Sequence, residues 1–145
     1  MWTLKFWREC GSGSAKPIVL TDTTFWIDLL EERHGGHPRP APATAFLARN
    51  RSQPLNVSII TWGELAEGFP DYHELNRFLR GIRILMLPQQ VAWEASRIQR
   101  ELAATGARLG ENDSWIAATA RTWGHRLLSR DLAFSRVRRL NVVRY

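Results

Sequence analysis

Four acidic residues stand where an apolar run of the sequence gives way to a helix-like pattern. They are Asp22 in IVLTDTTFWIDLL, Glu64 in VSIITWGELAEGF, Asp113 in GENDSWIAATA and Asp131 in RLLSRDLAF. Carboxylates delivered to one place repel one another unless cations join them. Hard divalent cations, Mg²⁺ or Mn²⁺, suit a site made only of carboxylates. The four acids therefore predict metal-assisted phosphodiester chemistry.

The apolar runs must become strands for the acids to meet. Their length and branched residues are typical of buried strands. We expect strands at 18–21, 55–60, 82–88, 126–129 and 140–143, and helices at 23–32, 43–50, 61 onward, 72–79, 89–105 and 114–123, with a proline–glycine loop at 34–42. This alternation predicts an α/β fold with a mainly parallel sheet and helices on both faces. The carboxyl ends of its strands would share one crevice, where ligands bind in open α/β sheets.

Each acid also has a structural interpretation. Asp22, Asp113 and Asp131 each precede a helix or turn and could act as N-caps. Thr61 and Glu64 form the T-x-x-E pattern of a capping box. A helix N-terminus stabilises an ionised carboxylate, so capping and metal binding can occur together.

Four segments of the sequence carry a family resemblance: TDTTFWIDLL, SIITWGELAEGF, LGENDSWIAATA and SRDLAFSRV with the final NVVRY. In order and spacing, residues 17–145 resemble a PIN-domain ribonuclease of the VapC toxin type. The resemblance implies a PIN-like three-layer sandwich, with a central, mainly parallel sheet flanked by helices. It also implies an endoribonuclease that uses Mg²⁺ or Mn²⁺ and leaves a 5′-phosphate and a 3′-hydroxyl.

The resemblance assigns the core site to Asp22, Glu64 and Asp113, with Asp131 as the fourth acid. Asp22 and Asp113 would hold a metal ion. Glu64 would hold or orient a metal-bound water. Asp131 would complete a second metal position or steady the nucleophile.

Several neighbouring residues have two interpretations each. Thr23 or Thr24 could hydrogen-bond the attacking water or a phosphate oxygen, or could serve only to start a helix. Arg130 could hold an RNA phosphate, or could pair with Asp131 and weaken metal binding there. Asp28, about one turn beyond Thr24, could support the site, although a solvated helix position is expected.

Composition and charge limit the class of protein. The chain has 145 residues, of which 44% are hydrophobic and 23% charged, as expected for one globular domain. The net charge of +6 and the pI of about 10.6 favour a nucleic-acid partner. Only Lys5 and Lys16 are lysines among 20 basic residues. This arginine bias suits RNA, but genomic composition would explain it equally well.

Other features exclude competing classes of site. Cys10 is the one cysteine, which rules out an internal disulfide and a cysteine-based metal site. The histidines lack zinc-ligand spacing, and neither a P-loop nor a G-x-S-x-G serine elbow is present. Neither a membrane span nor a signal-peptide core is evident, so we expect a soluble, cytoplasmic protein.

Residues 1–16 differ in character from the rest and are expected to form a flexible N-terminal extension to the PIN-like domain at 17–145. The resemblance further implies a VapB-like antitoxin partner and a homodimer. Two alternatives stay open: a catalytically silent PIN-like module that binds RNA or protein, and a structure-specific DNA nuclease, although the chain is compact for the latter.

Overall fold

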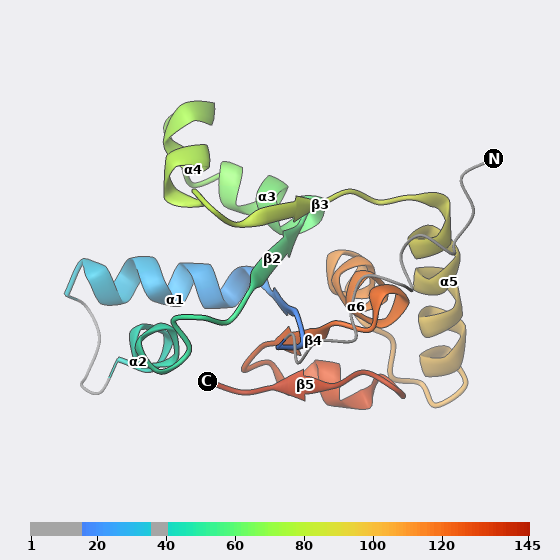
Figure 1. The fold of residues 1–145 in the computed structure, drawn as a ribbon. Coiled ribbons are helices and arrows are strands. Elements are labelled where there is room, and N and C mark those ends of the chain that lie inside the picture. The colour runs from blue at the N-terminus through green and yellow to red at the C-terminus, as the bar shows by residue number, and fades with distance from the viewer. Residues whose placement is uncertain (1–15, 36–40) are drawn as a thin grey trace.

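The computed structural model describes residues 16–35 and 41–145, and these form a three-layer α/β structure (Figure 1). The expected extension at 1–16 therefore lies almost wholly outside the described residues. So does the part of the proline–glycine loop at 36–40.

The middle layer is a five-stranded sheet in the order β3-β2-β1-β4-β5. Its strands are β1 (Val19–Thr21), β2 (Leu55–Ser58), β3 (Arg83–Leu85), β4 (Arg126–Leu128) and β5 (Val142–Val143). All neighbouring strands run parallel, and Thr21 lies level with Val57 on one side and Leu128 on the other. The expected parallel sheet is confirmed, with β1 at its centre and its carboxyl end between those of β2 and β4.

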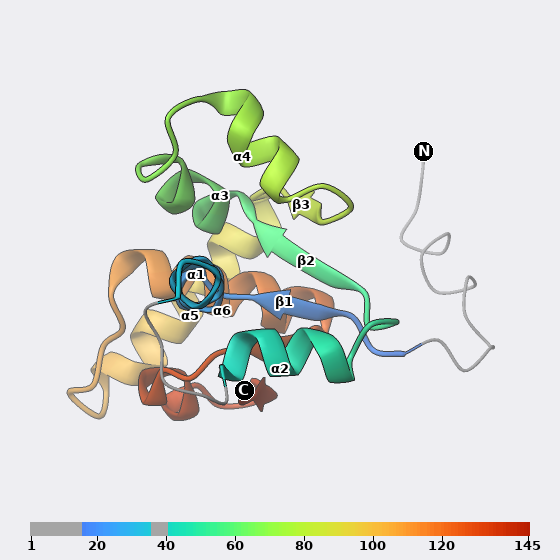
Figure 2. The ribbon, with the colours of Figure 1, turned by 90° about the vertical axis from the view of Figure 1, so that its left-hand side faces the viewer.

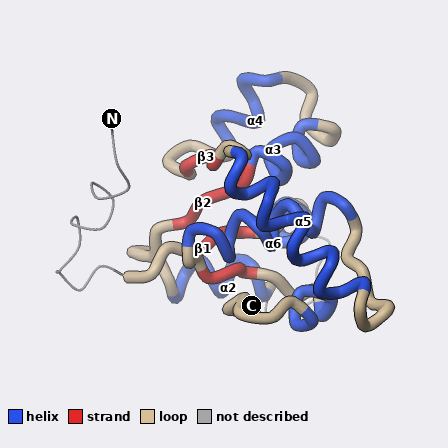
Figure 3. The backbone as a smooth tube through the Cα atoms, turned by 90° about the vertical axis from the view of Figure 1, so that its right-hand side faces the viewer, coloured by secondary structure: helices blue, strands red, loops and turns tan. Residues whose placement is uncertain are grey.

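Helices cover both faces of the sheet. They are α1 (Thr23–Arg33), α2 (Pro42–Arg49), α3 (Ile59–Ala66), α4 (Tyr72–Phe78), α5 (Gln89–Ala103) and α6 (Glu111–Trp123), with a short 3-10 helix η1 (Leu132–Arg136). Figure 2 views the molecule from the side of α1, and Figure 3 views it from the side of α5 and α6. The α/β three-layer architecture expected from the sequence is therefore confirmed.

Alternate residues of the strands enter two separate cores, because successive side chains of a strand point to opposite faces. Val19 packs with buried residues of α1 and α2, whereas Leu20 packs with those of α5 and α6. Leu127 and Leu128 divide in the same way. The sheet is thus buried on both faces, as parallel sheets require, and its residues are free for chemistry only at the strand ends.

Several element boundaries differ from the sequence expectation. The second strand ends at Ser58 and α3 begins at Ile59, whereas the isoleucines at 59 and 60 had the branched character of a strand. Pro42, expected in the loop, is the first residue of α2, a position that suits proline because its missing N–H has no helical partner there. The third strand is shorter than 82–88, and no helix in 16–35 or 41–145 is long and apolar enough to cross a membrane.

Candidate active site

Asp22 follows β1 directly and lies at the carboxyl edge of the sheet. It is the N-cap of α1, and its Oδ1 accepts a hydrogen bond of 2.9 Å from the backbone N–H of Phe25. The capping interpretation is therefore confirmed for this residue. Asp22 is also only 3% exposed, which is unusual for a carboxylate. Its burial therefore affects its ionisation, in addition to its role as a cap.

Asp131 follows β4 at the same edge of the sheet and is exposed. Its Oδ1 accepts a hydrogen bond of 2.8 Å from the backbone N–H of Ala133, so it caps η1, as the sequence suggested. The backbone register of β1 and β4, with Thr21 level with Leu128, brings the residues that follow these two strands together.

Ser129 joins these two acids and was missed in the sequence analysis. Its buried hydroxyl donates to Oδ2 of Asp22 and accepts a hydrogen bond of 3.0 Å from the backbone N–H of Asp131. The signal was a polar residue at the end of the strand that was expected at 126–129. Only the pairing of β4 with β1 shows that this hydroxyl reaches Asp22.

Glu64 lies on α3, and the capping box predicted for Thr61 and Glu64 is wrong. Ser58 is the N-cap of α3 and accepts a hydrogen bond of 3.1 Å from the backbone N–H of Thr61, because the helix begins earlier than expected. Glu64 is consequently inside the helix. Its Oε2 accepts a hydrogen bond from the Thr23 hydroxyl and its Oε1 accepts one of 2.9 Å from Nδ2 of Asn112. Glu64 thus joins the starts of α1 and α6.

The side-chain contacts of Thr23 and Thr24 only partly distinguish between a role in the site and a role in starting α1. Thr23 donates to Glu64, which goes beyond a simple role in starting α1. The half-buried Thr24 makes no side-chain hydrogen bond within 16–35 and 41–145. Their predicted contacts with water or phosphate stay predictions.

Asp113 lies in the first turn of α6, and the N-cap interpretation for it is wrong. The helix begins at Glu111, with Gly110 at the N-cap position, so Asp113 is already helical. Its carboxylate is half-buried and has no hydrogen bond or ion pair with another described side chain. The N-terminus of α6 places it near the other acids with its oxygen atoms unpaired.

The electrostatics link the acids to one another. Burial, and then the charges of Asp113 and Asp131, raise the pKa of Asp22 to about 6, although the hydrogen bonds from Ser129 and Phe25 oppose this shift. Burial, and then the charges of Asp131 and Glu64, raise the pKa of Asp113. No cation contributes to either shift. The structure therefore brings together the four acids predicted from the sequence and leaves their charge uncompensated.

The four acids have the donor atoms that a divalent metal prefers, but their side chains are not arranged around one metal position. Within 16–35 and 41–145, no three histidine, cysteine, aspartate or glutamate side chains are arranged to hold a metal ion. The donors nevertheless are oxygen atoms, which Mg²⁺ and Mn²⁺ prefer. A cation would also relieve the mutual repulsion that, after burial, raises the two pKa values. Metal binding by Asp22, Asp113 and Asp131 stays a prediction.

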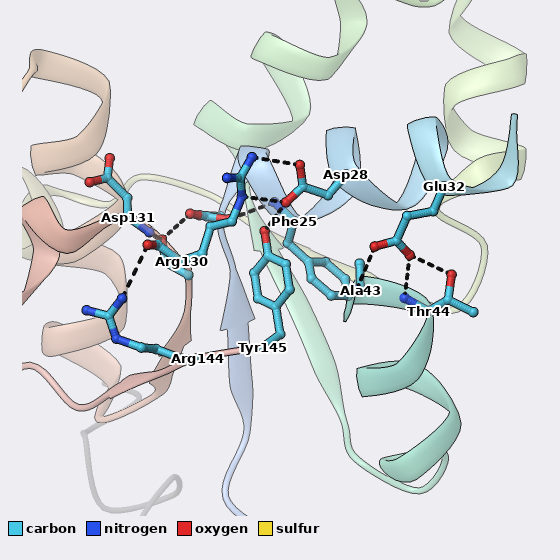
Figure 4. A network of polar contacts seen from close by, with 11 residues as sticks. Phe25, Asp28, Glu32, Ala43, Thr44, Arg130, Asp131, Arg144 and Tyr145 are labelled. Atoms are coloured by element: carbon cyan, nitrogen blue, oxygen red, sulfur yellow. Dashed lines mark hydrogen bonds and ion pairs between the residues drawn. The ribbon is translucent and has the colours of Figure 1, made fainter. Parts of the chain in front are cut away.

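Arg130 pairs with Asp28, so the alternative in which it pairs with Asp131 is wrong. Nε of Arg130 lies 2.6 Å from Oδ2 of Asp28, and Nη2 lies 2.9 Å from Oδ1 (Figure 4). The expectation that Asp28 is solvated is also wrong, since it is 4% exposed. Asp28 is on the inner face of α1, where the chain brings Tyr145 and Arg130 to it from far along the sequence.

Comparisons with known proteins agree with this architecture. The chain is similar over 88% of its length to VapBC2 from Rickettsia felis bound to a promoter DNA fragment, with 18% identity, 98% coverage of that chain and a TM-score of 0.73. A toxin–antitoxin complex from Klebsiella pneumoniae matches at 25% identity, covering 86% of this chain and 95% of that chain, with a TM-score of 0.63. VapC20 from Mycobacterium tuberculosis, a sarcin–ricin loop cleaving toxin, matches at 17% identity, covering 81% and 92%, with a TM-score of 0.60.

No curated protein sequence matches the chain significantly. The sequence pattern of the PIN domain, however, matches residues 19–140, which contain all four acids and every strand except β5. With this match and the parallel α/β fold that carries it, the chain belongs to the PIN-domain family.

Proposed function

We propose that the protein is a divalent-metal-dependent endoribonuclease and the toxin of a VapBC-type toxin–antitoxin pair. The observation that carries this proposal is the group of four acids at the carboxyl edge of the sheet, in which Asp22 and Asp113 have raised pKa values and no compensating cation. A scaffold that only binds a partner has no need to keep such mutually repelling carboxylates together.

We assign each acid a role that its contacts support. Asp22, held rigidly by Ser129 and the N-terminus of α1, and Asp113, with its oxygen atoms unpaired, are the metal ligands. Glu64 has both carboxylate oxygen atoms engaged by Thr23 and Asn112, so it orients a water and does not bind the ion directly. Asp131 is at the exposed rim and is available for a second ion or for the nucleophile.

The metal, when bound, supplies a Lewis acid for the scissile phosphate and lowers the pKa of water. The chain supplies the positions of the reactants. In-line attack then leaves a 5′-phosphate and a 3′-hydroxyl, as the family resemblance implies. The net charge of +6 favours RNA approaching an edge of the sheet that is itself acidic.

Similar structures support the choice of substrate and partner. VapC20 cleaves the sarcin–ricin loop, an RNA, and VapBC2 is a complex bound to its promoter DNA. By analogy, this chain would cleave RNA and would be inhibited by a small DNA-binding antitoxin.

Cleavage of RNA by the purified protein, with and without metal, tests the proposal. Cleavage should require Mg²⁺ or Mn²⁺, stop with chelator and disappear in Asp113→Asn. Asp71→Asn is a matched control, because Asp71 is an exposed N-cap on α4 that accepts a hydrogen bond from Glu74 and belongs to no acid group. It should cleave at the parental rate.

Expression in a bacterium tests the toxin assignment separately. The parental protein should arrest growth, Asp113→Asn should not, and the product of the neighbouring gene should restore growth. Full cleavage in excess chelator would overturn the metal site. A protein that cleaves no RNA with metal present and causes no arrest would instead be a silent PIN-like module that binds RNA or protein.

A further inference from the structure

A cluster of three residues, Asp28, Arg130 and Tyr145, lies beside the acid site and has no part in the proposed reaction. Asp28 accepts two hydrogen bonds from Arg130 and one of 2.6 Å from the Tyr145 hydroxyl (Figure 4). These residues are separated by 102 and 117 positions from Asp28 in the sequence. The fold therefore assembles the cluster, which we call the Asp28 clamp.

The Asp28 clamp fixes the guanidinium group of Arg130 in place. A buried carboxylate is unfavourable unless it is paired, and Asp28 is paired because it accepts three hydrogen bonds. Tyr145 is fixed in turn, since its ring packs edge-to-face on Phe25 with centroids 5.1 Å apart. Burial, and then the hydrogen bond to Asp28, raise the pKa of Tyr145, so its hydroxyl keeps the proton that it donates.

One side of the guanidinium group stays available to a ligand. Arg130 uses Nε and Nη2 on Asp28, and Nη1 has no partner within 16–35 and 41–145. The Arg130 side chain is 57% exposed, whereas that of Asp28 is 6% exposed. Arg130 therefore has one edge bound to the protein and another edge open to solvent.

The Asp28 clamp lies beside the acid site, since the charge of Asp22, after burial and the hydrogen bond to Asp28, is among the causes that raise the pKa of Tyr145. Arg130 follows Ser129, which donates to Asp22, and precedes Asp131, whose carboxylate caps η1. Figure 4 shows the guanidinium directed toward Asp28 and the carboxylate of Asp131 pointing elsewhere. A guanidinium group fixed beside the acids offers an RNA phosphate N–H donors next to carboxylates that would otherwise repel it.

We propose that Arg130, held by the Asp28 clamp, binds a backbone phosphate of the RNA next to the phosphate that is cleaved. This inference rests on the proposed function. Arginine binds phosphate through its fork of N–H groups, and a guanidinium that is already fixed loses less conformational freedom on binding. Arg130 is thus a substrate-binding residue, and Asp28 and Tyr145 are positioning residues.

The test separates phosphate binding from a purely structural role of the same ion pair. Arg130→Gln removes the cation. The double variant Asp28→Asn with Arg130→Gln removes both charges, so it keeps the parental net charge and leaves no unpaired buried carboxylate. Arg77→Gln is the matched control, because Arg77 is an exposed arginine on α4 with only a weak ion pair at 3.8 Å to Glu74. Melting temperatures establish that each variant is folded.

Kinetics on an RNA substrate form the first measurement. Arg130→Gln and the double variant should raise KM about tenfold or more while kcat changes little, since a charged hydrogen bond to bound substrate is lost. Arg130→Lys should recover part of the loss, because it keeps the charge without the fork. Tyr145→Phe, which keeps the ring on Phe25, should raise KM by a smaller factor. Arg77→Gln should match the parent.

Binding of an RNA oligonucleotide, measured by fluorescence anisotropy in the Asp113→Asn background, needs no cleavage and forms the second measurement. Loss of one phosphate contact should reduce the slope of log Kd against log salt by about 0.7–1 for Arg130→Gln and the double variant, but not for Arg77→Gln. Equal slopes and equal KM values for these variants would overturn the inference even if the parent cleaves RNA. A parent that cleaves no RNA, yet shows the expected change of slope, would overturn the proposed function and leave the phosphate site standing.

Discussion

Asp22 caps a helix, and we propose that it also binds a metal ion, two roles that are usually alternatives. It caps α1 through Phe25, and it is also the most deeply buried of the four acids, with a pKa of about 6. A helix N-terminus and the Ser129 hydroxyl stabilise its ionised form, and burial together with neighbouring carboxylates opposes it. Because burial and the neighbouring carboxylates outweigh these two hydrogen bonds, the ionised form of Asp22 lowers the stability of the folded protein.

Replacing Asp22 with Asn should increase stability at neutral pH. The pKa of Asp22 rises from 3.8 unfolded to about 6 folded, so the folded protein binds the extra proton between these values, and stability falls as pH rises through that window. Asn keeps the cap and cannot ionise. Urea unfolding should show Asp22→Asn to be more stable than the parent by up to about 3 kcal/mol above pH 6, with little difference near pH 4.

The same variant should cleave no RNA, because a neutral amide is a poor ligand for a divalent cation. Stability above that of the parent together with lost cleavage would be hard to explain by a capping role alone. An Asp22→Asn variant that cleaves normally would assign Asp22 to capping, and one that is less stable than the parent at neutral pH would contradict the raised pKa.

Ser129→Ala should shift the acid side of the pH–activity profile upward. The Ser129 hydrogen bond is the largest influence that lowers the pKa of Asp22, so its removal raises that pKa further. More of Asp22 is then protonated at a given pH below neutrality. Loss of a hydrogen bond to a charged group should also cost about 1.5–3 kcal/mol at neutral pH. Cleavage rates from pH 5 to 8 check the shift, and an unmoved profile would contradict it.

At the scale of the element, α3 shows what sequence could and could not settle. A T-x-x-E pattern at Thr61 and Glu64 matches a capping box, yet the structure caps α3 at Ser58. Ile59 and Ile60 favour a strand by local preference, whereas the tight β2–α3 junction places them in a helix. Local preference is a weak guide where tertiary packing decides, so this boundary was outside the reach of the sequence.

Ser58→Ala should therefore destabilise the protein by about 1 kcal/mol, the usual effect of losing an N-cap. Ser96→Ala is a suitable control, because Ser96 is an exposed serine inside α5 that bonds only the carbonyl oxygen of Trp93. It should change the free energy of unfolding little, since alanine is a good helix former. Equal effects of the two substitutions in urea unfolding would argue against the observed start of α3.

At the scale of the whole molecule, the alternation of apolar runs with helical patterns was enough to predict the parallel sheet and its covering helices. It also placed Asp22 and Asp131 at one edge, because strands that run parallel end at the same edge. The Asp28 clamp could not be predicted in this way. Asp28 had the spacing of an ordinary helix residue, and only the folded chain brings Arg130 and Tyr145 to it.

Metal binding should stabilise the whole fold, since a ligand that binds only the native state raises its stability. At about 100 times its Kd, Mg²⁺ or Mn²⁺ would add about 2.7 kcal/mol, or several degrees of Tm for a chain of this size. The increase in Tm should be smaller at pH 5, where a proton competes with the metal ion for Asp22, and it should be absent in Asp113→Asn. An equal increase in Tm for the variant would locate the binding ions elsewhere.

The two outermost strands of the sheet are short, three residues in β3 and two in β5. An exposed strand is a template on which other chains can add strands and aggregate, and very short edge strands offer few unpaired backbone groups for this. The protein thus has little capacity to join copies of itself through one continuous sheet. Within the described residues, we therefore expect helix surfaces to offer copies of the protein more contact area than these strand edges, so tolerance to high concentration should depend on the surface of those helices.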